Sequence, residues 1–175
     1  EVHPTYPVNG TIKEQAKKRY HIELLSEGYE ANIAELLELC NHKNWQLIIR
    51  DWTFIDFTPH EINGFQPSYR FTAYDLLKNT FEIDAVAFVR NPIDIWISRN
   101  CPPKFFEVYK KYVRCLVEND IDVIKYEDFC ADHKHKMNEI CKKLNIPFHS
   151  AYLNFYSIQD MSGDNGSHPG SRGSE

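Results

Sequence analysis

The residues best suited to chemistry lie at positions 89–99, which read VRNPIDIWISR. Arg90 follows an apolar run typical of a buried strand, and Ser98 lies eight residues further on, in a segment that can form a helix. This spacing predicts a guanidinium and a hydroxyl near one opening, where the planar arginine fork suits two oxygens of a phosphate. The spacing equally allows Arg90 to pair with Asp94 while Ser98 faces solvent.

The pattern of apolar residues predicts the elements that must position these groups. Thr11 and Glu14 form a capping box that predicts a first helix. Helical periodicity predicts further helices around residues 33–40 and over 68–79, 93–99, 104–118 and 130–144. Short apolar runs predict buried strands at 46–49, 84–89 and 121–125. Residues 1–10, 52–66 and 160–175 are predicted to be irregular, the middle segment with some packing of its own.

Strands that alternate with helices favour one α/β domain over residues 1–175, with a parallel β-sheet flanked by helices. Ligands of such sheets bind beyond the carboxyl ends of the strands. Each predicted strand ends there in polar residues: Arg50-Asp51, Arg90-Asn91 and Tyr126-Glu127-Asp128. We therefore expect the functional site at this edge.

Composition narrows the classes of function. The 175 residues are 42% hydrophobic, enough for a core, and no apolar run is long enough to span a membrane. A net charge of −5 argues against a nucleic-acid partner. Five cysteines without a C-x-x-C pair favour reduced thiols and a cytoplasmic location. No metal is expected, because Cys130, His133, His135 and Cys141 complete no recognisable zinc spacing.

Several segments resemble motifs of the sulfotransferase family in the same order. VRNPIDIWISR resembles the family's 3′-phosphate-binding motif, in which a serine follows the arginine by eight residues. IDVIKYEDF at 121–129 resembles its later strand and Tyr-Glu-Asp-Leu motif, and CKKLNIP at 141–147 resembles the segment after it. LIIRDW at 47–52 occupies the place of its central strand. The resemblance covers residues 46–148, with a weaker match at 162–164, and implies a P-loop NTPase-like sulfotransferase architecture.

The resemblance implies a function and roles for residues. The family transfers a sulfonate group from 3′-phosphoadenosine 5′-phosphosulfate (PAPS) to a hydroxyl or amine of a small-molecule or carbohydrate acceptor. By resemblance, Arg90 and Ser98 would bind the 3′-phosphate, Tyr126 would lie near the adenine, and Arg172-Gly173 would close over the nucleotide.

In-line sulfonate transfer needs a cation on the bridging oxygens and a base near the acceptor. We expect Arg50 to supply the cation and Asp51, at a predicted strand end, to be the base. His60 and Asp56 are the other bases considered. A salt bridge to Arg50 or a helix cap is an equally good role for Asp51. Trp52 stands where the family often has a catalytic histidine.

One part of the family pattern is not recognisable: the N-terminal strand and the Gly/Ser/Thr-rich phosphate loop with its lysine. Asn9-Gly10-Thr11 is the nearest candidate. A phosphate cradle needs consecutive backbone N–H groups at the start of a helix. This departure favours a second hypothesis, a truncated or degenerate sulfotransferase-like domain that binds nucleotide or a partner without catalysis. A nucleotide kinase is disfavoured because no Walker-type loop is present.

Overall fold

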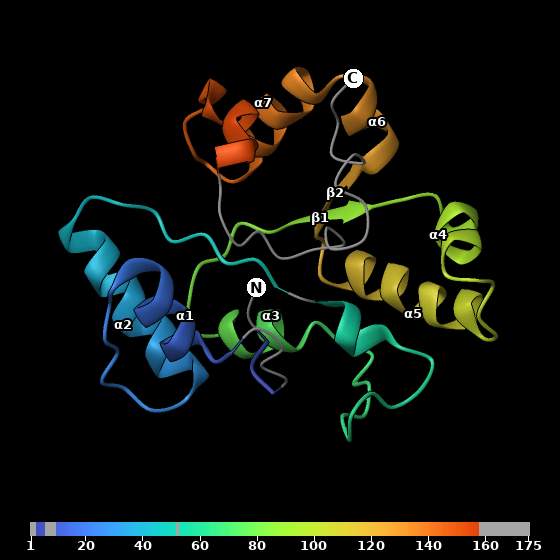
Figure 1. Cartoon of the computed structure of the whole chain (residues 1–175), viewed down its shortest axis with the longest axis horizontal. Coiled ribbons are helices and arrows are strands. Elements are labelled where there is room, and N and C mark those ends of the chain that lie inside the picture. Colours follow the sequence, from blue (N-terminus) through green and yellow to red (C-terminus); the bar gives the residue numbers. More distant parts are fainter. Residues whose placement is uncertain (1–2, 6–9, 52, 158–175) are drawn as a thin grey trace.

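A computed structural model describes residues 3–5, 10–51 and 53–157, and the side chains up to residue 153 (Figure 1). The strands in this part are β1 (Val86–Val89) and β2 (Asp122–Lys125). The helices are α1 (Ile12–Tyr20), α2 (Tyr29–His42), α3 (Thr72–Leu77), α4 (Pro92–Ser98), α5 (Phe105–Glu118), α6 (Tyr126–Ala131) and α7 (His133–Lys143). Two 3₁₀ helices are η1 (Thr53–Phe57) and η2 (Ser150–Ser157).

The two strands form a small parallel sheet at the centre of the helices. Val86 pairs with Asp122 and Val89 with Lys125, and the chain crosses from one strand to the other through α4 and α5. Figure 1 shows α1 and α2 to the left of the sheet, α4 and α5 to the right, and α6 and α7 above it. A parallel sheet flanked by helices is therefore confirmed, and the two later predicted strands are found in shortened form.

The predicted strand at residues 46–49 is wrong, because the structure assigns no strand there. Ile48 is 64% exposed, and the side-chain amide of Gln46 donates to the Asn145 carbonyl oxygen beyond α7 at 2.9 Å. A strand inside a parallel sheet must be buried on both faces, and this segment is not. The described sheet consequently has two strands where three were expected.

The helices follow the sequence signals closely. The Thr11 hydroxyl accepts a hydrogen bond from the Glu14 N–H, and the Glu14 carboxylate accepts one from the Thr11 N–H, so the predicted capping box starts α1. α2 buries Ile33, as its spacing predicts. The predicted helix over 130–144 is found as α7, and a separate helix, α6, begins directly after β2, where a polar strand end was predicted.

The main hydrophobic cluster lies between α5, η1 and the start of α3. Its buried members are Phe57, Phe71, Val108 and Leu116. The rings of Phe57 and Phe71 lie 5.4 Å apart, and Tyr112 of α5 contacts both edge-on at 5.3 and 5.7 Å. This cluster fixes α5 against the segment of residues 53–72, and α5 in turn supports the connection between the two strands.

Candidate functional site

The carboxyl end of the sheet brings two predicted site residues together. Because Val89 pairs with Lys125, the next residues along each strand, Arg90 and Tyr126, are neighbours. The Arg90 guanidinium carbon lies 5.7 Å from the centroid of the Tyr126 ring, and both residues are exposed. Arg90 has no ion pair with Asp94 in the described part of the chain, so that alternative is not seen. Arg90 and Tyr126 together form an exposed surface with a cation beside an aromatic ring.

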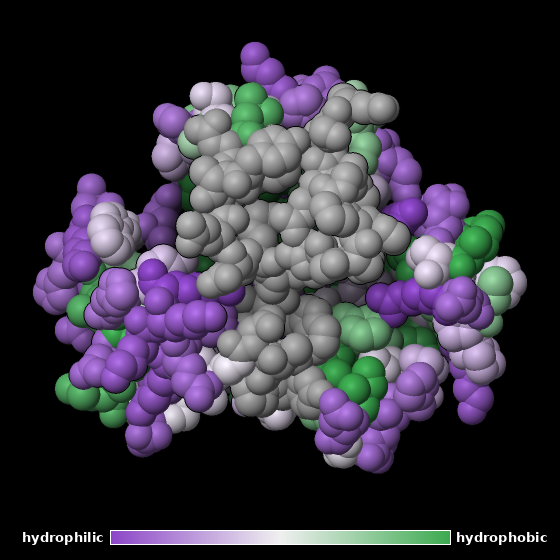
Figure 2. All heavy atoms as spheres, in the orientation of Figure 1, coloured by the Kyte–Doolittle hydropathy of each residue, from purple (hydrophilic) through white to green (hydrophobic). Residues whose placement is uncertain are grey.

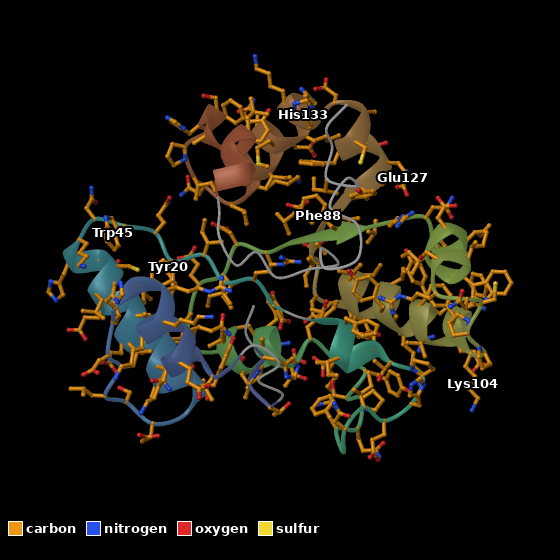
Figure 3. The ribbon with its side chains drawn as sticks, viewed as in Figure 1. Tyr20, Trp45, Phe88, Lys104, Glu127 and His133 are labelled. Atoms are coloured by element: carbon orange, nitrogen blue, oxygen red, sulfur yellow. The ribbon has the colours of Figure 1, made fainter. Side chains whose placement is uncertain are left out.

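Three further groups surround this surface. The Asn91 N–H donates to the Glu127 carboxylate at 2.7 Å, and the Tyr109 hydroxyl donates to the Arg90 carbonyl oxygen at 3.1 Å. The hydrogen bond from the Asn91 backbone is the main cause that lowers the pKa of Glu127, with smaller contributions from the Arg90 and Lys125 charges. Figure 3 shows Glu127 where α6 begins, beside the strand that carries Phe88. The edge therefore holds a fixed carboxylate as well as a guanidinium.

Ser98 is the last residue of α4, and its position depends on how that helix starts and ends. The Asn91 side chain accepts a hydrogen bond from the Ile93 N–H at 2.9 Å, and Pro92 occupies the first helical position. At the other end the Ser98 hydroxyl donates to the Ile95 carbonyl oxygen at 2.9 Å. Ser98 is exposed, with its proton committed to its own helix.

Arg50 and Asp51 follow residues 46–49, which are not part of the sheet. The strand register therefore does not carry them to the edge where Arg90 lies. Arg50 is exposed and Asp51 is half-buried. Burial raises the pKa of the Tyr29 phenol in α2, and the nearby Asp51 charge raises it further. Asp51 thus lies beside the start of α2.

His60 lies in the exposed loop after η1, and its carbonyl oxygen accepts a hydrogen bond from the Thr58 hydroxyl at 2.7 Å. Among the described residues no hydrogen bond or ion pair joins His60 to Arg90 or to Asp51, so its predicted catalytic role stays a prediction. Arg172 and Gly173 lie outside the described residues, as do Trp52 and positions 162–164.

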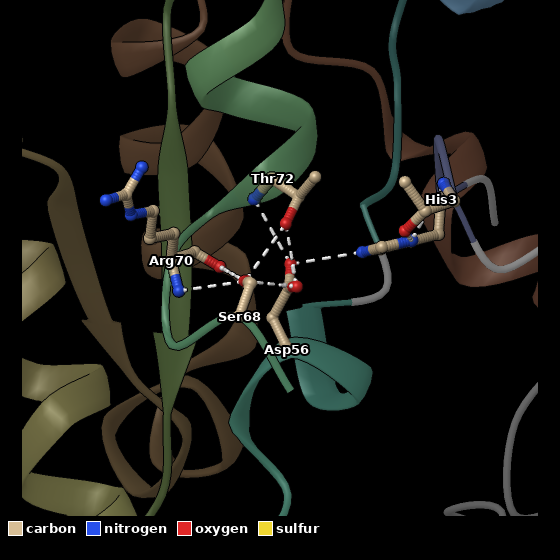
Figure 4. A network of polar contacts seen from close by, with 6 residues as sticks. His3, Asp56, Ser68, Arg70 and Thr72 are labelled. Carbon is tan, nitrogen blue, oxygen red and sulfur yellow. Dashed lines mark hydrogen bonds and ion pairs between the residues drawn. The ribbon is translucent and has the colours of Figure 1, made fainter. Parts of the chain in front are cut away.

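Asp56, considered above as a base, belongs to a buried network (Figure 4). Its carboxylate accepts hydrogen bonds from the Ser68 hydroxyl at 2.6 Å, the Thr72 hydroxyl at 2.7 Å and the Thr72 N–H at 3.1 Å. The Thr5 N–H donates to His3 Nδ1, so the proton is on His3 Nε2, which donates to the second carboxylate oxygen of Asp56 at 3.1 Å. Burial acts to raise the pKa of Asp56, but these hydrogen bonds outweigh it and lower the pKa. A fully enclosed carboxylate with all these donors cannot reach a substrate, so Asp56 is a structural residue.

The start of α1 is the nearest candidate for a phosphate cradle, and a carboxylate of the chain already occupies it. Glu14 Oε2 accepts from the Thr11 N–H at 2.6 Å. Gly10 has φ +87°, and a Cβ there would come within 2.8 Å of the same oxygen. The Thr11 N–H is thus taken by the Glu14 carboxylate and the Glu14 N–H by the Thr11 hydroxyl, so these two donors are not available to a nucleotide.

Three features of the described chain bear on thiol chemistry, metal binding and membrane contact. All five cysteines are free thiols. No group of three or more metal-ligating side chains is found in the described ranges. The helices described here are also too short or too polar to cross a lipid bilayer.

Comparisons of the chain with models of known protein families, with curated proteins and with solved structures give no match.

Two residues that contact predicted site residues could not be found from the sequence. Tyr109 bonds to Arg90 from the middle of α5, and no local pattern links these positions. His3 contacts Asp56 across 53 residues of sequence. Glu127 was visible as part of a polar strand end, although its bond to the Asn91 backbone was not.

Proposed function

We propose that the chain is a sulfotransferase-type domain that binds PAPS at the carboxyl end of β1 and β2. The supporting observation is the placement of the Arg90 guanidinium 5.7 Å from the Tyr126 ring at this edge, next to the helix that ends in Ser98. A guanidinium binds a phosphate through two parallel hydrogen bonds, and an aromatic ring offers a stacking surface to a purine. These are the roles that the resemblance assigns to the two residues.

The described side chains fit a 3′-phosphonucleotide under two conditions. Arg90 can direct its N–H donors to the phosphate, because no carboxylate among the described residues forms an ion pair with it. The Ser98 hydroxyl must rotate away from the Ile95 carbonyl oxygen before it can donate to a ligand. The phosphate must also approach Arg90 from the side away from Glu127, because two like charges in contact are unfavourable.

In the proposed reaction the acceptor oxygen or nitrogen attacks the sulfur of PAPS, and the bond from sulfur to the 5′-phosphate oxygen breaks. Adenosine 3′,5′-bisphosphate leaves with the electron pair, and the acceptor proton goes to a base. As predicted from the sequence, we assign the base to Asp51 and stabilisation of the departing oxygen to Arg50, which requires the phosphosulfate to extend from the strand edge at Arg90 to residues 50–51. Asp51 is half-buried, which suits a base that must be partly shielded from water.

A second function, nucleotide binding without sulfonate transfer, is favoured by one specific observation. The Glu14 carboxylate occupies the start of α1, the candidate cradle for the 5′-phosphosulfate. Backbone donors at the leaving group are often the largest catalytic contribution, and each one removed costs about a hundredfold or more in rate. Without such donors the domain would hold the nucleotide and turn it over very slowly.

Titration calorimetry with adenosine 3′,5′-bisphosphate and with AMP tests the binding half of the proposal. We expect the bisphosphate to bind more tightly, and Arg90→Ala to lose about 2–4 kcal/mol, or roughly 30- to 1,000-fold in affinity, as for a charge-assisted contact. Lys134→Ala removes an exposed charge on α7 and serves as the matched control. Equal affinity for the two nucleotides would contradict the proposal. Tyr126→Ala should also weaken binding, and Tyr126→Phe should not.

Transfer of radiolabelled sulfonate from PAPS to a panel of phenols, amines and sugars then separates the two functions. Turnover that Arg90→Ala reduces supports the sulfotransferase. Binding of the bisphosphate without transfer to any acceptor supports the second function instead.

A further inference from the structure

The outer face of α5 carries an apolar seam that stays partly exposed in the described structure. Phe106, Val113 and Val117 are 41%, 39% and 75% exposed, on the side of the helix opposite the buried Val108. With Lys110 they are spaced by four, three and four residues. This alternation is the spacing of the contact positions of paired helices, in which a single lysine fixes the register.

We infer that this seam binds the same seam of a second copy of the chain, with the two helices antiparallel across a two-fold axis. In this arrangement Phe106 lies opposite Val117 of the partner subunit, and Lys110 lies opposite the partner's Val113. The two-fold axis repeats each of these two pairs, so the interface contains four layers of paired side chains. The lysine stem can lie along valine while its ammonium group reaches solvent.

The charged residues beside the seam favour a second copy of the chain as the partner, and they favour antiparallel over parallel helices. Glu107 and Arg114 each follow a seam residue directly, both are exposed, and neither has an ion pair among the described residues. In the antiparallel pair Glu107 lies nearest to the partner subunit's Arg114, and the symmetry makes this contact twice. Parallel helices would instead direct both charges toward the partner's Tyr109 and Leu116, of which Leu116 is buried in the core.

The neighbouring helix extends the surface. The Trp96 ring of α4 lies 5.6 Å from the Phe106 ring, and α4 exposes Ile93 and Ile97 one helical turn apart. Hydrophobic side chains lie open over α4 on the right of Figure 2. A helix of 14 residues is about 21 Å long, so the contact is smaller than a standard protein interface. We therefore expect a reversible dimer with a dissociation constant on the order of micromolar.

Charge exchange across the seam provides the test, with sedimentation equilibrium over a wide range of protein concentration as the readout. Glu107→Arg and Arg114→Glu should each weaken the dimer at least tenfold, because like charges then meet twice. A one-to-one mixture of the two variants should restore dimerisation, since each contact again joins an arginine to a glutamate. The double variant, E107R with R114E, should also dimerise like the parent. Glu82→Arg and Lys134→Glu make the same charge changes at exposed positions away from α5, and should leave the dimer unchanged.

The positions changed are exposed, so circular dichroism should show folded variants. A chain that stays monomeric up to hundreds of micromolar overturns the inference, and the seam then fits an acidic amphipathic helix of another protein. Dimers that ignore both single charge changes, or that the mixture fails to restore, overturn it as well.

Discussion

Replacing Asp56 with alanine should destabilise the fold more than any change at an exposed aspartate. The carboxylate is fully buried and accepts hydrogen bonds from Ser68, Thr72 and His3. Alanine removes the acceptor but leaves those donors in place. A buried donor without an acceptor costs about 1–3 kcal/mol, and several donors lose their acceptor here at once.

Because four hydrogen bonds to the carboxylate are lost together, the expected loss is about 3–5 kcal/mol, a large part of the roughly 5–15 kcal/mol that holds a typical domain together. Asp56→Asn keeps the shape and one acceptor oxygen, and should cost about half as much. His3→Ala should cost about 1–3 kcal/mol, because three of the four hydrogen bonds to Asp56 remain.

Urea unfolding followed by circular dichroism measures these losses, with Asp84→Ala as the matched exposed control. Asp84 is exposed and has no hydrogen bond or ion pair among the described residues, so its replacement should stay within about 0.5 kcal/mol. A cost below about 1 kcal/mol for Asp56→Ala would show that the network does not hold the N-terminal segment and α3 together.

The same network gives a pH dependence with a definite sign. The folded-state pKa of Asp56 lies below its ordinary value of 3.8, because its hydrogen bonds outweigh the effect of burial. The stability that this carboxylate contributes is therefore fully present above about pH 5 and is lost as the pH falls through the folded pKa. The difference between the parent and Asp56→Ala should accordingly be constant near neutral pH and should shrink below pH 4.

Two further predictions concern the helix start and the proposed base. Thr11→Ala removes the side-chain cap of α1 and should cost about 1 kcal/mol in urea unfolding, whereas Thr11→Ser should be nearly neutral; equal losses would contradict the capping argument. If sulfonate transfer is detected, Asp51→Asn should lower turnover at least a hundredfold while calorimetry shows little change in bisphosphate affinity, and normal turnover would move the base to His60.

The parts of the fold that could be predicted are those encoded by local pattern. The capping box of Thr11 and Glu14 and the periodicity of α2 and α5 depend on neighbours within a few residues, and these helices form where expected. The apolar runs of β1 and β2 were also identified. Because the two strands pair in parallel register, the residues that directly follow them, Arg90 and Tyr126, lie side by side.

Long-range pairing explains what could not be predicted. Residues 46–49 have the composition of a strand. However, strand formation depends on a neighbouring strand and on burial of both faces, and a four-residue sequence determines neither. Ile48 remains 64% exposed as a result. The bond between His3 and Asp56 spans 53 residues without any motif, so Asp56 was considered as a base although it is a structural acceptor.

Glu127 offers the last test, because it bears on where the proposed ligand meets the chain. Its carboxylate lies close enough to Arg90 for the arginine charge to lower its pKa, so it also opposes a phosphate that binds to Arg90. Glu127→Gln removes this charge but keeps an oxygen that can accept from the Asn91 N–H. Removing one like charge near a dianion at a protein surface weakens the repulsion, so the bisphosphate should bind about fivefold more tightly. The gain should shrink in 0.5 M salt, as expected of an exposed electrostatic effect. Glu82→Gln is the control, and unchanged or weaker binding by Glu127→Gln would place the phosphate away from Arg90.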